Sequence, residues 1–122
     1  MAQVQNKSYD LEERTSKFSE MLIALCKTCP KNTITIPIID QLIRSGTSIG
    51  ANYFEANGAS SKKDFKNKVF ICKKEAKETQ YWLRLLAQSI DDEKLKQDCR
   101  RLWQEAKELG MIFSAIASKT GN

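Results

Sequence analysis

A seven-residue spacing of small and apolar side chains runs through most of the sequence and limits the folds open to it. Within each segment these residues recur at alternating steps of four and three, which places them on one face of an α-helix. The longest such row comprises Phe65, Val69, Cys72, Ala76, Thr79, Leu83, Leu86 and Ile90. Rows this narrow are buried best against other helices that cross at about 20°. The pattern therefore predicts an all-α protein without strands.

Four segments carry rows of this kind, over residues 8–29, 37–57, 61–89 and 92–118. Residues that start or stop helices bound them: Pro30 follows the first segment and Gly58 ends the second. Ser61, with Asp64 three residues later, forms a variant of the capping box that opens the third. Short connections make sequential helices antiparallel. We therefore expect a single domain over residues 1–122, an antiparallel up-down-up-down four-helix bundle.

One connection has a composition typical of strands. The segment "NTITIP", residues 32–37, contains β-branched residues and ends in a proline that suits the opening turn of a helix. We expect this segment to be an extended connector between the first two helices.

The stretch "RSGTSIGANYFEANGAS", residues 44–60, places small residues where a helix interior usually has larger ones. Gly46 and Gly50 lie one turn apart and share a face with Tyr53. A phosphate-binding loop is excluded because the Gly-Lys-Ser/Thr ending and a preceding strand are both missing. Each glycine costs about 1 kcal/mol of helix propensity relative to alanine. We interpret the pair as a site of close helix packing; a surface approached by a ligand or a nucleic-acid backbone is the alternative.

The absence of histidine removes several enzyme classes. Glu55, Glu75 and Glu78 suggest a carboxylate-bridged di-iron bundle, but that site needs histidines one turn from glutamates. Ordinary Ser-His and Cys-His dyads are excluded for the same reason. We expect a protein that is not an enzyme and that carries no cofactor and no metal.

The four cysteines form one isolated CxxC pair, Cys26 and Cys29, and two single residues, Cys72 and Cys99. A zinc site needs a second pair or nearby histidines. We interpret all four as reduced, buried, small side chains. The longest apolar run, residues 21–26, is far shorter than the roughly 20 residues that span a bilayer, and no secretory signal is visible. We expect a cytoplasmic protein without membrane contact.

The net charge of +5 is unevenly placed. Residues 62–84 hold eight basic and three acidic side chains, and helical spacing aligns five of the basic ones as a stripe: Lys62, Lys66, Lys73, Lys77 and Arg84. The last helical segment carries a shorter stripe, Lys96, Arg100 and Lys107, with Trp103 nearby. Such faces attract phosphate by releasing counterions. Nucleic-acid binding is one interpretation, and a solvated lysine face that keeps the protein soluble is the other.

The third helical segment also has apolar residues outside its buried row. Ile71, Trp82 and Leu85 lie roughly opposite the basic stripe, with Glu78 among them. A helix that is apolar on two faces must pack against other protein surface on both, and a single bundle buries one of them. We interpret these three residues as a subunit interface; a wide monomeric core is the alternative.

Two runs carry a family resemblance. "LIRSGTSIGANYFEA" contains Arg44, Ser45, Ser48, Asn52 and Glu55, and "KKEAKETQYWLRLL" contains Glu75, Glu78, Tyr81 and Trp82. They resemble the four-helix-bundle proteins encoded in intervening sequences of 23S ribosomal RNA genes. Many relatives have an aromatic residue where this chain has Cys29, before the proline that ends the first helix. The resemblance implies a homopentamer without established enzymatic activity.

A related branch, the accessory proteins of diversity-generating retroelements, is similar in fold, basic, and acts with a reverse transcriptase and nucleic acid. Our leading hypothesis is a non-enzymatic accessory or scaffold protein that binds RNA or DNA, with a reverse-transcriptase-like protein as a further partner. A protein-interaction scaffold with no nucleic-acid role is the alternative. We further expect Ser45, Ser48, Asn52, Glu55 and Tyr81 to form a buried polar network that fixes helix register.

Overall fold

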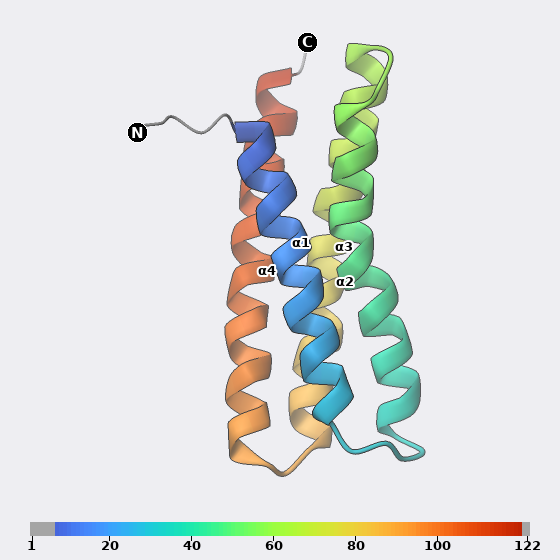
Figure 1. The fold of residues 1–122 in the computed structure, drawn as a ribbon, viewed down its shortest axis with the longest axis vertical. Coiled ribbons are helices and arrows are strands. Elements are labelled where there is room, and N and C mark those ends of the chain that lie inside the picture. Colours follow the sequence, from blue (N-terminus) through green and yellow to red (C-terminus); the bar gives the residue numbers. More distant parts are fainter. Residues whose placement is uncertain (1–6, 121–122) are drawn as a thin grey trace.

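The computed structural model describes residues 7–120, which form four helices: α1 (Lys7–Thr28), α2 (Thr35–Asn57), α3 (Lys62–Ser89) and α4 (Glu93–Thr120). Within these residues no strand occurs, which confirms the all-α prediction. The α1–α2 and α3–α4 connections lie at one end of the molecule and the α2–α3 connection at the other (Figure 1). None of the described helices combines the length and apolarity needed to cross a bilayer.

The predicted rows form the core. On α3 every member of the row is buried except Phe65, which is half-buried at the start of the helix. The row predicted on α4, which is buried except for its two half-buried ends, comprises Leu95, Cys99, Leu102, Ala106, Leu109, Phe113 and Ile116. The ring of Phe113 lies 5.5 Å from that of Tyr53 on α2. Burial of one row per helix orients all other faces of these helices, so it fixes which side chains border each groove on the surface.

The start of α2 corrects one prediction. Residues 35–37 are helical rather than extended, so α2 begins two residues before the expected position. The side chain of Asn32 accepts the backbone N–H of Thr35 at 2.9 Å, and the Thr35 hydroxyl in turn accepts the backbone N–H of Asn32 at 3.0 Å. Pro37 fits in the first turn because no backbone donor is needed there. The β-branched composition of this segment suggested an extended connector, whereas Asn32 and Thr35 form a reciprocal helix cap.

Other helix ends are fixed by side chains in the same manner. Ser61 accepts the backbone N–H of Asp64 at 3.0 Å, as the capping pattern predicts. Lys31 donates to the carbonyls of Cys26 and Cys29 at 2.7 and 2.6 Å, so its ammonium closes the end of α1, where carbonyls lack helical partners. These caps stop the helices at defined points and keep the connections short.

The two glycines of α2 allow α1 to approach very closely. A Cβ atom placed on Gly46 would lie 2.1 Å from Cδ2 of Leu22, which is fully buried. A Cβ on Gly50 would lie 3.2 Å from both Cβ and Oγ1 of Thr15. The interpretation as a site of close helix packing is confirmed, and the contact between α1 and α2 compensates for the poor helix propensity of glycine.

This contact gives a stability prediction with a control within the same chain. Gly46→Ala forces Leu22 to move inside a packed core, and we expect it to lower the free energy of unfolding by about 1–2 kcal/mol. Gly110→Ala on α4 places its Cβ 3.6 Å from that of Ala76, an ordinary contact. We expect this second change to be neutral or to add up to about 1 kcal/mol through helix propensity. Urea unfolding measures both, and equal stability of the two variants would contradict the packing account.

Candidate nucleic-acid interface

Six of the predicted basic residues border one groove between α3 and α4. A hollow of about 420 Å³ is lined by Arg84 from α3 and by Lys96 and Arg100 from α4. A second hollow of about 220 Å³ is lined by Lys73 and Lys77 from α3 and by Lys107 from α4. We call this surface the basic groove, and it consists of Lys73, Lys77, Arg84, Lys96, Arg100 and Lys107. The two stripes predicted on separate helices therefore meet across one groove.

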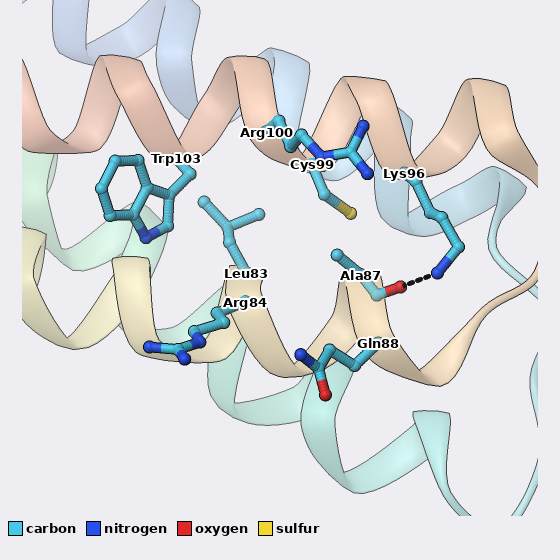
Figure 2. Close-up of a pocket in the computed structure, with 8 residues that line it drawn as sticks. All are labelled: Leu83, Arg84, Ala87, Gln88, Lys96, Cys99, Arg100 and Trp103. Carbon is cyan, nitrogen blue, oxygen red and sulfur yellow. Dashed lines mark hydrogen bonds between the residues drawn. The ribbon is translucent and has the colours of Figure 1, made fainter.

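The larger hollow has a defined layout (Figure 2). Trp103 and Lys96 stand at its two ends, with Leu83 and Arg100 between them. The ammonium of Lys96 donates to the carbonyl of Ala87 at 2.8 Å. This carbonyl lies near the C-terminal end of α3, where the helix dipole favours a positive charge. Lys96 is therefore partly engaged in holding α3 against α4.

Three cations of the basic groove have no polar partner among the described residues. Among the described residues, the side chains of Lys73, Lys77 and Arg84 take part in no ion pair or hydrogen bond. Arg100 lies 3.7 Å from an oxygen of Glu93, and both of these side chains are exposed. None of the described residues that line the two hollows is acidic. The positive charge of this surface is thus largely uncompensated.

The groove between α1 and α4 shows the opposite arrangement. Arg14 contacts Glu105 at 2.7 Å and Glu108 at 2.6 Å, and Arg101 pairs with Asp98. The hydrogen bond to Glu105 is the main cause that raises the pKa of Arg14 above its ordinary value. Charges on that side neutralise one another, so the chain's surplus of positive charge is most available in the basic groove.

Lys62 and Lys66 lie on α3 outside the basic groove. Lys62 is exposed in the first turn. The ammonium of Lys66 lies 5.8 Å from the ring centroid of Phe70, in a cation–π contact. Neither lysine lines the two hollows that define the basic groove.

A polar cluster connects α2 to α3 on the other side. Arg44 lies between Glu75, whose Oε1 is 3.6 Å from Nη1, and Glu78, to which it is hydrogen-bonded. The indole N–H of Trp82 also donates to Glu78, at 3.0 Å. This hydrogen bond, followed by that from Arg44, lowers the pKa of Glu78. Glu75 is buried, and its Oε1 accepts no hydrogen bond from any described residue.

The predicted polar network is divided into separate pairs. The hydroxyls of Ser45 and Thr79 are hydrogen-bonded at 3.1 Å across the α2–α3 contact. Asn52 donates to the hydroxyl of Ser48 at 2.9 Å within α2. The expectation is wrong for two members: Glu55 is exposed and paired with Lys68 at 2.6 Å, and Tyr81 is 56% exposed. The Glu55 carboxylate is long enough to reach solvent, and Tyr81, two residues from buried Thr79, lies on the outer face of α3.

The predicted interface residues Ile71, Trp82 and Leu85 are each half-buried. Trp82 packs on the core and meets the ring of Tyr81 edge-on, with centroids 4.9 Å apart. Phe70, which the sequence reasoning missed, is 46% exposed on α3, on the side of Lys66 rather than that of Trp82. Its spacing of 11 residues from Tyr81, about three helical turns, was the available signal. Phe70 and Tyr81 are each more exposed than any of the three residues that were predicted.

The cysteines have the environment expected of small buried side chains. All four are free and buried. Burial raises the pKa of Cys26, Cys72 and Cys99 to about 12, so these thiols stay protonated at neutral pH. Among the described residues, no group of three or more His, Cys, Asp or Glu side chains is arranged to hold a metal ion.

The fold and this surface define a class, an all-helical four-helix protein with a basic groove along one side. Residues 7–115 match the family described as 23S rRNA-intervening sequence protein, and the chain belongs to that family. It is also similar to the crystal structure of a protein of unknown function from the S23 ribosomal protein family of Bacteroides thetaiotaomicron. The two are 32% identical with a TM-score of 0.79, over 93% of this chain and 99% of the other. No curated protein matches the sequence.

The Arg44 cluster yields a pH-dependent prediction. Because the native pKa of Glu78 is lowered, its ionised form stabilises the fold above the ordinary carboxyl pKa of about 4.3. This contribution is lost as the pH falls through the native pKa. We expect Arg44→Met to lower the unfolding free energy by on the order of 1 kcal/mol at pH 7, and by less below pH 4.

Urea unfolding at several pH values measures this difference. Lys68→Met is the matched control, because it removes the more exposed pair with Glu55 and should change stability by less than about 0.5 kcal/mol. If Arg44→Met lowered the unfolding free energy by the same amount at pH 7 and at pH 3.5, ionised carboxylates would not be the source of the stability of this cluster.

Proposed function

We propose that the chain is a non-enzymatic accessory protein that binds nucleic acid through the basic groove. The observation that carries the proposal is the set of unpaired cations Lys73, Lys77 and Arg84, which face Arg100 and Lys107 across the α3–α4 groove. Cations without internal partners keep their full attraction for an external anion. Paired cations, such as Arg14 on the other side of α4, have already been neutralised.

The groove suits a polymer of phosphates better than a single small anion. Its cations extend along two helices rather than converging on one point, and each phosphate neutralised releases condensed counterions. Lys73, Lys77 and Arg84 follow one another along α3 at intervals of one and two turns, about 6 and 10 Å. A backbone lying along the groove meets these charges in succession.

The chemistry of the chain supports a binding role rather than a catalytic one. Histidine is absent from the sequence, and the buried cysteines have raised pKa values, so none supplies a thiolate nucleophile at neutral pH. In this proposal the groove holds a polyanion and leaves its bonds intact.

The family description names the intervening sequence of 23S rRNA, and the similar crystal structure is described as from the S23 ribosomal protein family. RNA is therefore the first polymer to test, with DNA beside it. A reverse transcriptase as protein partner and a cytoplasmic location stay predictions from the sequence.

Charge reversal in the basic groove tests the proposal. We expect Lys73→Glu with Lys77→Glu to weaken binding of a fluorescent 20-nucleotide RNA at least about tenfold at low salt, and to reduce the slope of log affinity against log salt by about 1–2. Fluorescence anisotropy over a salt series measures both quantities.

The matched control is Lys17→Glu with Lys119→Glu, which makes the same change in net charge on exposed lysines of α1 and α4 away from the groove. This variant should bind RNA with nearly wild-type affinity. If both variants lost RNA affinity equally, net charge alone would explain binding and the groove would have no special role. If wild-type protein bound no RNA at low salt, the proposal would be wrong.

We also infer that the four helices run antiparallel, up-down-up-down, and that the bundle assembles with copies of itself, five being the number that the family resemblance implies. The positions of the connections in Figure 1 support the helix order. Exposed Tyr81 beside half-buried Trp82, together with exposed Phe70 further along α3, supports a contact on the outer face of this helix. Burying that face removes aromatic surface from water, which favours association.

Sedimentation velocity at micromolar concentration tests the assembly. We expect the wild-type chain to sediment as an oligomer and Phe70→Glu with Tyr81→Glu to sediment as a folded monomer. Ile23→Glu with Ile36→Glu is the control, because these residues are similarly exposed on α1 and α2, and it should leave the oligomer intact. A wild-type monomer would refute the inference.

A further inference from the structure

The two tryptophans of the chain stand in different chemical situations. The indole N–H of Trp82 donates to Glu78, and its ring packs on Tyr81 and the core. Trp103 also packs on the core, is half-buried on α4 and lines the larger hollow of the basic groove. Its indole N–H donates no hydrogen bond to any described residue. The indole N–H of Trp82 is used within the chain, whereas Trp103 presents an unused donor and part of its ring to a cationic groove.

Cations flank Trp103 along one face of α4. Arg100 is three residues before it and Lys107 four residues after it, which places all three side chains on the same side of the helix. The ammonium of Lys107 lies 5.7 Å from the centroid of the indole ring. Arg84 reaches the same hollow from α3 (Figure 2). The Trp103 ring therefore has one cation on each side, roughly 5–6 Å away along the helix axis. In a nucleic-acid strand, each base likewise lies between two phosphates, so one base on the ring would place its phosphates near the two cations.

We propose that the basic groove takes single-stranded nucleic acid, with one base stacked on Trp103 and the adjoining phosphates on Arg100, Lys107 and Arg84. This inference rests on the proposed function of the groove. Stacking on an aromatic side chain requires the face of a base, and a duplex offers base edges because the faces are already covered by neighbouring pairs. Single strands offer both faces and follow a cationic track.

A variant with one tryptophan reports on this contact directly. Trp82→Phe leaves Trp103 as the sole tryptophan of the chain. We expect a 20-nucleotide oligodeoxythymidine to quench the fluorescence of this variant. A blunt 20-base-pair duplex and inorganic polyphosphate at equal phosphate concentration should bind through charge without quenching it.

Affinity measurements give a second readout that does not depend on the reporter variant. Trp103→Leu should weaken binding of the single strand by about tenfold, the effect of losing one stacked base, and leave binding of polyphosphate unchanged. Trp103→Phe keeps an aromatic ring and should lose less affinity for the single strand than Trp103→Leu. Trp82→Leu, the same change at the tryptophan held by Glu78, should not alter affinity for the single strand as long as circular dichroism shows a folded helical protein and sedimentation shows the wild-type assembly.

The outcomes separate this inference from the proposed function. Binding of single strand and duplex with equal affinity, without quenching and without an effect of Trp103→Leu, would overturn the stacking site and leave a charge-driven polyanion groove. Failure of every polyanion to bind wild-type protein at low salt would overturn both. Quenching by the single strand alone, together with the loss in Trp103→Leu, would establish the stacking site.

Discussion

Each helix of this protein buries one narrow row of side chains, and the position of every other residue follows from that burial. A helix with one face fixed in the core has its remaining faces fixed as well, since successive residues are turned by about 100°. On α3 this places Val69, Leu83 and their row inside, the Glu75 and Glu78 carboxylates towards Arg44 of α2, and the unpaired lysines towards α4. One helix therefore contributes to a core, a polar cluster and a basic groove.

The contact between α1 and α2 imposes a second constraint. Gly46 and Gly50 have no side chain because Leu22 and Thr15 occupy that space. Charges on the α1–α4 side are paired with one another, as Arg14 is with Glu105. The surface is therefore asymmetric: one side of α4 is electrostatically neutralised and the other is positive. This asymmetry, more than the net charge, singles out the α3–α4 side for a polyanion.

The fold was predictable because burial follows the helical period, which a sequence displays directly. The start of α2 was missed because the cap between Asn32 and Thr35 uses side-chain hydrogen bonds within a β-branched segment. Both basic stripes were visible in the sequence, but their meeting across a groove depends on how α3 and α4 rotate against each other. Glu55 was misplaced because spacing gives the face of a helix and not the reach of a side chain into solvent, whereas the position of Tyr81 two residues from buried Thr79 already indicated the outer face.

The most direct test is a titration of ¹⁵N-labelled protein with a single-stranded oligonucleotide, followed by heteronuclear NMR. The two indole N–H groups give separate signals. The account predicts that the Trp103 indole signal and the backbone signals around Lys77, Arg84 and Arg100 shift together, while the Trp82 indole and the backbone of α1 stay in place. Shifts centred on α1, or a Trp82 indole that moves while Trp103 does not, would contradict it.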